Sequence, residues 1–143
     1  MKFKVPNKIE IKESPGKGMG VFSTDFIKKG EVIEECYIIK LPTKRWETSS
    51  MLLYDYRFCY PQGENWTEYV IPLGYGCVYN HSDENNAMWR NHSTKRGFEF
   101  YACRDIEIGE EICTNYGPDY KWVKKYKYKY EKNNLDRYGR GFS

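Results

Sequence analysis

The sequence predicts one mainly β domain. Short runs of strand-forming residues recur along the chain, and Gly, Pro, Asn or Asp closes each of them, a pattern typical of strands joined by turns. Hydrophobic residues make up 40% and aromatic residues 17% of the 143 residues, which is enough for one core but not for two full-sized domains. Only residues 44–58 have a helical pattern, because a capping candidate at Thr43 precedes apolar residues at 51–53 and 56.

Seven strands are expected in chain order. The first two flank a glycine-rich turn, and the third is a long, mostly apolar run. The fourth ends at Pro72, the fifth follows a turn rich in Asn and Asp, and the last two begin shortly after Gly97 and Gly109. Their ranges are 9–12, 19–23, 32–41, 69–71, 87–90, 98–102 and 111–114.

Charge is distributed unevenly along the chain. Residues 117–143 carry eight Lys and Arg against three Asp and Glu, a net +5, so residues 1–116 carry −2 of the total +3. An acidic body would suit a groove that receives a basic peptide, and a solvated charged face is the structural alternative. With no signal peptide and no run of 18 apolar residues, we expect an intracellular protein without membrane contact, in its own cytoplasm or in a host nucleus.

The cysteines give no sign of a metal site. Their number is odd, and no pair has zinc-knuckle or redox spacing, so we expect reduced, mostly buried thiols and no bound metal. They are Cys36, Cys59, Cys77, Cys103 and Cys113.

Lys and Tyr alternate between positions 124 and 132. In a strand this pattern places Tyr126, Tyr128 and Tyr130 on one face and Lys on the other. The stripe has a structural interpretation, and a second one as a platform for single-stranded nucleic acid.

Three segments could carry chemistry, although each has an ordinary structural explanation when taken alone. Residues 16–22 read as a glycine hairpin, residues 80–86 as a polar turn beginning Asn80-His81-Ser82, and residues 104–117 as a turn and strand ending in Tyr116-Gly117. A hydrolase is a poor fit, because His81 and Ser82 are immediate neighbours and no nucleophile elbow is present.

Taken together and in this order, the three segments resemble the SET-domain family of protein lysine methyltransferases. The similarity covers about residues 8–122 and is strongest to the minimal stand-alone members of viruses and bacteria. It implies small curved β-sheets in which the Asn80 segment and the Tyr116 strand pass through one another as a pseudoknot. It also implies a domain over residues 1–122, closed by a basic aromatic tail over residues 123–143 in place of a cysteine-rich segment.

The resemblance implies S-adenosylmethionine as cofactor and assigns residues to it. The residues expected to bind the cofactor are Lys17, Gly18, Met19, Gly20, Asn80, His81, Tyr116 and Trp122. Tyr116 matches the catalytic tyrosine, and Tyr56 resembles a channel tyrosine with a supporting catalytic role. The lysine channel would be lined by Tyr56, Trp89 and Thr114. For Tyr56 and Trp122, simple core filling is the alternative.

The chemistry of that assignment is consistent. Free lysine titrates near pH 10.4, so only about one amine in a thousand is neutral at pH 7. An aromatic channel beside a cation lowers that pKa through desolvation and like-charge repulsion, and a tyrosine hydroxyl can orient the neutral amine.

Two departures from the family pattern concern the turn and the product. Asn85 stands where the family commonly has Pro, so a looser turn is expected, while Asn86 keeps the match. Thr114 replaces a bulkier residue and alone predicts room for di- or trimethylation, whereas Trp89 could reverse that expectation.

Two functions from different classes therefore follow. The first is methylation of a protein with a basic tail, such as histone H3. The second is a binding module that keeps the fold without turnover and recognises protein or nucleic acid through the Lys/Tyr tail. Because small members sometimes dimerise, a homodimer is also compatible with the sequence.

Overall fold

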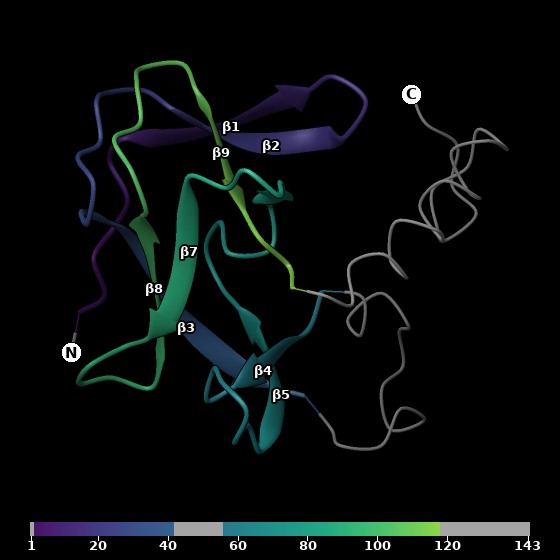
Figure 1. Cartoon of the computed structure of the whole chain (residues 1–143). Coiled ribbons are helices and arrows are strands. Elements are labelled where there is room, and N and C mark those ends of the chain that lie inside the picture. Colours follow the sequence, from purple (N-terminus) through teal and green to yellow (C-terminus); the bar gives the residue numbers. More distant parts are fainter. Residues whose placement is uncertain (1, 42–55, 118–143) are drawn as a thin grey trace, which may run out of the picture.

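The computed structural model describes residues 2–41 and 56–117, and every regular element there is a strand (Figure 1). The strands form a four-stranded sheet of order β1-β2-β9-β6 and a five-stranded sheet of order β4-β5-β3-β8-β7. Their bounds are Ile9–Ser14 (β1), Gly18–Ser23 (β2), Val32–Lys40 (β3), Phe58–Tyr60 (β4), Glu68–Pro72 (β5), Asn80–His81 (β6), Ala87–Asn91 (β7), Gly97–Ala102 (β8) and Glu111–Thr114 (β9). The mainly β prediction is confirmed.

The smaller sheet, at the top of Figure 1, begins with the predicted glycine hairpin. Strands β1 and β2 pair antiparallel, from Ile9 opposite Ser23 to Ser14 opposite Gly18. Gly16 and Gly18 have φ of 75° and 80°, left-handed values that a side chain strongly disfavours, so the turn depends on glycine. On its other side β2 pairs antiparallel with β9.

Strand β6 lies parallel to β9, with Asn80 opposite Cys113 and His81 opposite Thr114. These segments are about 30 residues apart in the chain, so the Asn80 segment must cross to the far edge of the sheet to reach β9. This is the pseudoknot arrangement that the resemblance implies.

The larger sheet supplies most of the core. β3 pairs antiparallel with β5 and β8, and β8 pairs with β7. Alternate residues of β8 are buried, as expected for a strand with one face on the core, and Phe98 and Phe100 are fully buried. The core cluster comprises Ile9, Val21, Ile27, Ile33, Cys36, Ile38, Val70, Tyr79, Ala87, Phe98, Phe100, Ala102, Ile106 and Ile112.

All seven predicted strands are present, but three predictions need correction. Phe58 begins strand β4, so the end of the helix predicted over residues 44–58 is wrong, and residues 44–55 lie outside the described part of the chain. Strands β4 and β6 were not predicted. β4 has only three residues and begins where the helix was expected to end, and β6 has only two residues, both polar. The cysteines are less buried than expected: all five are free, but only Cys36 and Cys113 are buried.

Within residues 2–41 and 56–117 we find no helix that could span a membrane.

Candidate active site

The three predicted segments meet in the smaller sheet, where β9 lies between β2 and β6. The side chain of Asn80 reaches across β9: its Nδ2 donates to the backbone oxygen of Met19 at 3.1 Å and to Oε2 of Glu111 at 3.3 Å. One side chain therefore connects the glycine hairpin, β9 and the Asn-His-Ser segment.

Gly20 is buried beneath Asn80. A Cβ atom at this position would lie 2.9 Å from Nδ2 of Asn80 and 3.2 Å from both the Glu111 side chain and Cβ of Ser14. The hydroxyl of Ser14 in turn donates to Glu111. Because these neighbours hold one another in place, glycine is needed here for close approach, whereas at Gly16 and Gly18 it is needed for the turn.

Tyr116 is anchored at both ends of the residue. Its backbone N–H donates to Nδ1 of His81 at 3.0 Å, and its hydroxyl donates to the backbone oxygen of Tyr79. The residue is 41% exposed, so it stays accessible from outside the protein. Because Nδ1 of His81 accepts this hydrogen bond, Nε2 carries the ring proton and faces Oδ1 of Asp83 at 3.0 Å. The hydrogen bonds to the Tyr116 N–H and to Asp83 fix the His81 ring, and the bonds to His81 and Tyr79 fix Tyr116.

Asn86 ties the crossing segments together. Its Nδ2 donates to the backbone oxygen of Glu111 at 2.9 Å, and its Oδ1 accepts from the backbone N–H of Cys113 at 2.9 Å. The Asn86 side chain is buried, with 3% of the residue exposed, so both of these strand groups are satisfied away from water. Nearby, the backbone N–H of Ser82 donates to the backbone oxygen of Thr114 at 3.0 Å.

The other residues predicted for the site differ in burial and in position relative to Asn80 and Tyr116. Thr114 is buried in β9 opposite His81, at the base of the loop that carries Tyr116. Tyr56 is 37% exposed, and its backbone oxygen accepts a hydrogen bond from the Cys77 thiol at 3.7 Å. This contact places Tyr56 beside the segment that precedes Asn80 in the chain. Lys17, Gly18 and Met19 are exposed along the hairpin. Trp122 and the tail 123–143 lie outside the described residues.

Trp89 lies on β7 in the larger sheet. Its ring packs edge-on against Phe58, with ring centroids 4.9 Å apart, and lies 6.2 Å from the ring of Phe100. These contacts make it part of the wall of the aromatic core, so its predicted place in the lysine channel stays a prediction.

The thiols of Cys36, Cys77 and Cys113 do not supply a nucleophile at neutral pH. Burial raises the pKa of Cys77 and of Cys113 to about 11, with the carboxylates of Glu34 and Glu111, respectively, adding to the effect. Burial also raises the pKa of Cys36. This disfavours covalent cysteine catalysis by these three residues.

Two important residues were missed by sequence analysis. Tyr79, just before Asn80, is 1% exposed and supplies the carbonyl that accepts from Tyr116. Glu34, which is also 1% exposed, accepts a hydrogen bond from the Tyr79 hydroxyl at 2.7 Å. The available signal was an acidic residue two positions before Cys36 and four before Ile38, on the same face of the strand as these two buried residues, because a buried carboxylate needs partners.

A polar cluster outside this site resembles a metal site in composition only. Glu35, His92 and Glu99 each bring one possible ligand atom within 4.8 Å of the others. However, Nδ1 of His92 accepts from the backbone N–H groups of Thr94 and Lys95, at 3.1 and 3.0 Å. Nδ1 is therefore unprotonated, so Nε2 carries the proton and lacks the lone pair that a metal ligand needs. Nε2 of His92 lies 3.4 Å from Oε1 of Glu35 and 3.5 Å from Oε1 of Glu99, so its N–H faces two carboxylates.

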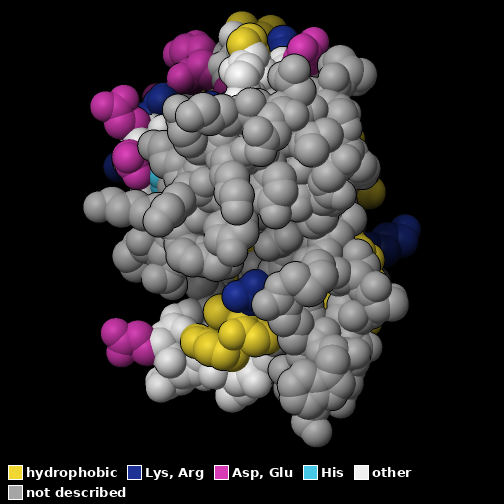
Figure 2. Space-filling model, turned by 90° about the vertical axis from the view of Figure 1, so that its right-hand side faces the viewer, with side chains coloured by type: hydrophobic (Ala, Val, Ile, Leu, Met, Phe, Trp, Pro, Cys, Tyr) yellow, Lys and Arg dark blue, Asp and Glu magenta, His cyan; other side chains and the backbone are white. Residues whose placement is uncertain are grey.

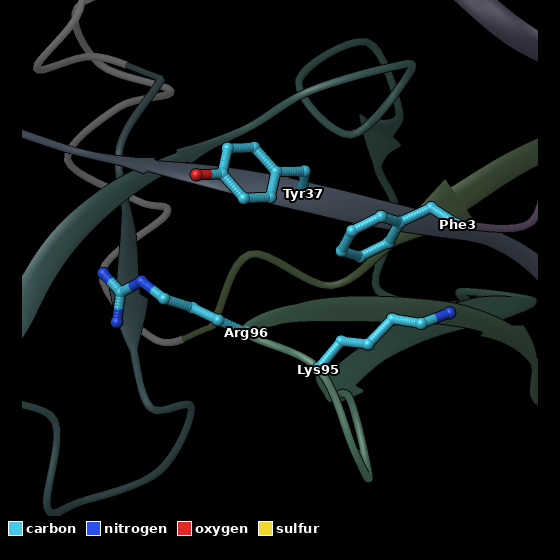
Figure 3. A pocket seen from close by; sticks show the side chains of 4 residues that line it. All are labelled: Phe3, Tyr37, Lys95 and Arg96. Atoms are coloured by element: carbon cyan, nitrogen blue, oxygen red, sulfur yellow. The ribbon is translucent and has the colours of Figure 1, made fainter. Parts of the chain in front are cut away.

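A separate pocket of about 430 Å³ is lined by Phe3, Tyr37, Lys95 and Arg96. Figure 3 shows the two rings on one side and the two basic side chains on the other. Lys95 and Arg96 are ion-paired with Glu35 and Glu68, and no predicted site residue lines this pocket. We therefore place the candidate active site in the smaller sheet.

Comparison with known proteins agrees with this assignment. A histone-lysine N-methyltransferase of Schizosaccharomyces pombe, described as specific for H3 lysine-37, is 26% identical over 118 residues, covering 81% of this chain and 77% of that protein. A crystal structure of a protein from Plasmodium falciparum, proposed to be a histone methyltransferase, matches with a TM-score of 0.65 and 36% sequence identity, covering 80% of this chain and 96% of that one. The sequence model of the SET domain matches residues 18–117, which contain all three segments. This chain therefore belongs to the SET domain family.

Proposed function

We propose that this chain transfers methyl groups from S-adenosylmethionine to lysine side chains of histone H3. The observation that carries the proposal is the Tyr116 hydroxyl, held on the Tyr79 carbonyl beside Asn80 and His81 within the matched SET region. A binding module that performs no transfer would need the same fold, but it would not need an accessible tyrosine whose hydroxyl and backbone N–H are both hydrogen-bonded.

The residues of the smaller sheet fit the cofactor. Lys17, Gly18 and Met19 are exposed residues of the hairpin, and a Cβ at Gly18 would meet nothing within 4 Å, so there is room for a ligand beside the chain there. Asn80 and His81 lie across the sheet from this edge. When bound, S-adenosylmethionine supplies a methyl group already activated by its sulfonium.

Tyr116 orients the acceptor lysine. Because the hydroxyl proton is committed to the Tyr79 carbonyl, the phenol oxygen is left with lone pairs that accept hydrogen bonds. A neutral lysine amine can donate an N–H to that oxygen, which orients the amine and leaves its nitrogen lone pair free to act as the nucleophile. Thr114 stays predicted to allow more than one methyl group in the channel.

The substrate class rests on charge and on the relatives. Residues 1–116 carry a net −2. In Figure 2 several acidic side chains lie at the top and upper left of the view, with Lys and Arg side chains among them. A basic histone tail is complementary to a net negative charge. The Schizosaccharomyces pombe relative is described as acting on a lysine of H3.

The proposal is tested by incubating the full chain with core histones and S-adenosylmethionine carrying a labelled methyl group. We expect label in H3, located at lysine by mass spectrometry of the digested histone. If the folded chain binds S-adenosylmethionine but labels no histone or histone peptide, the proposed activity is wrong. Retention of a basic peptide or of single-stranded nucleic acid without transfer would then support the binding-module function.

A first prediction concerns Gly20. Gly20→Ala should weaken S-adenosylmethionine binding by about tenfold, because the added Cβ displaces Asn80 and a lost hydrogen bond of about 1.4 kcal/mol corresponds to that factor. Titration calorimetry measures the Kd. Ile11→Val, on the neighbouring strand β1, is the control and should bind normally. An unchanged Kd for Gly20→Ala would show that Asn80 does not contribute to binding from this position.

A further inference from the structure

Glu34 is a buried carboxylate without a cationic partner among the described residues. It lies in β3 with 1% of its surface exposed, and no ion pair in residues 2–41 and 56–117 includes it. Burial raises its pKa, although hydrogen bonds donated by the Tyr79 hydroxyl and the Tyr75 N–H oppose the rise. Burying a carboxylate without a cation destabilises the folded protein, so we expect a function that explains its position.

Besides the thiol of Cys36 on its own strand, the contacts of Glu34 lead to the segment just before Asn80. Oε1 accepts from the Tyr79 hydroxyl at 2.7 Å, and Oε2 accepts from the Tyr75 backbone N–H at 3.3 Å. Gly74, with φ of 76°, packs so closely that a Cβ there would lie 2.9 Å from Oε2. The carboxylate therefore holds both ends of the stretch from Gly74 to Tyr79.

Tyr79 transmits this constraint to the candidate active site. Its side chain is fixed by Glu34 and by stacking on Phe100, with ring centroids 4.7 Å apart and an interplanar angle of 17°. Its backbone oxygen accepts the hydroxyl proton of Tyr116. One residue thus has its side chain tied to Glu34 and its carbonyl tied to Tyr116.

We propose that Glu34 is a positioning residue for methyl transfer, acting through Tyr79 to aim the Tyr116 hydroxyl. Asn80 is held separately, by Met19, by Glu111 and by pairing of β6 with β9, so loss of the Glu34 contact should misplace Tyr116 more than the cofactor site. This inference rests on the proposed function, because it assigns Glu34 to that reaction.

A double-mutant cycle tests the linkage. Glu34→Leu and Tyr79→Phe should each lower kcat by about tenfold, since small displacements of a positioned group cost factors of this size or larger. The double variant should lose no more than Glu34→Leu alone, because that change already removes the hydrogen bond that Tyr79→Phe removes. Glu34→Gln keeps an acceptor for Tyr79 and should restore kcat to within about threefold of the native protein. The Kd of S-adenosylmethionine should stay within about threefold throughout.

The double variant also guards against simple unfolding. It replaces both groups of the Glu34–Tyr79 hydrogen bond by apolar groups and so removes the buried hydroxyl that Glu34→Leu leaves unpaired. Only the half-buried Tyr75 N–H and the Cys36 thiol lose their acceptor, as they do in Glu34→Leu, so the double variant should remain folded even if Glu34→Leu does not. Tyr37→Phe, a change at a 51% exposed tyrosine on the same strand β3, is the matched control and should leave kcat unchanged. Multiplicative losses of about a hundredfold in the double variant, or a normal kcat in folded Tyr79→Phe, would overturn the linkage.

A second readout does not require turnover. In protein labelled with carbon-13 at tyrosine Cζ, the Tyr116 resonance is assigned by its loss in Tyr116→Phe. Its shift should move in Glu34→Leu and in Tyr79→Phe, but not in Tyr37→Phe. A native protein that transfers no methyl group would overturn the proposed function, whereas an unmoved Tyr116 resonance would overturn the role of Glu34.

Discussion

Tyr116→Phe is expected to lower kcat for methyl transfer by about a hundredfold or more, because one well-placed hydrogen-bonding group at a reaction centre is worth factors of that size. The variant removes only the hydroxyl, and with it the donor to the Tyr79 carbonyl and the acceptor for the lysine amine. The ring and the backbone bond to His81 remain. Binding of S-adenosylmethionine should therefore be nearly unchanged.

The measurement is single-turnover transfer of labelled methyl to histone H3, together with the Kd of S-adenosylmethionine by calorimetry. Tyr37→Phe serves as the control for loss of one tyrosine hydroxyl at an exposed position. Full turnover by Tyr116→Phe would remove the role we assign to this hydroxyl. A large loss of cofactor affinity instead would make Tyr116 primarily a binding residue.

The larger part of the fold could be predicted from local pattern. Strands such as Gly97–Ala102 combine period-two alternation with nearby turn residues, and both signals are local. Strand β6 could not be found in this way. It has only two residues, Asn80 and His81, both polar, and it exists because β9 offers a parallel partner from 33 residues further along the chain.

The candidate site also has residues that the sequence predicts and residues that only long-range contacts reveal. The order of the three segments was sufficient to identify the family and to place Asn80 and Tyr116. It could not reveal Glu34 or Tyr79, because their importance comes from a hydrogen bond between residues 45 positions apart. Nor could it assign Trp89, whose ring packs against Phe58 on a strand that resembled the end of a helix in sequence. Long-range pairing decides these cases, and local propensity does not.

Asn86 carries the second large expected effect, which is on stability. Asn86→Ala should lower the free energy of unfolding by about 2–4 kcal/mol, since it leaves a buried N–H of Cys113 and a buried carbonyl of Glu111 without partners, at about 1–3 kcal/mol each. Urea unfolding followed by fluorescence measures this loss. Asn85→Ala is the matched control, because Asn85 makes one bond to the Ala87 carbonyl at 3.0 Å and is less buried; it should lose about 1 kcal/mol or less.

Asn86→Asp separates the two contacts. It keeps the acceptor for the Cys113 N–H but turns the donor toward Glu111 into a second acceptor, so its carboxylate would face a backbone carbonyl without a proton between them. We expect a loss at neutral pH at least as large as that of Asn86→Ala, and a smaller one in acid, where a protonated carboxyl can donate again. Equal stability of Asn86→Ala and Asn85→Ala would mean that pairing of β6 with β9 holds the crossing without Asn86. A large difference would mean that this amide fixes β9 in the place from which Tyr116 reaches Tyr79.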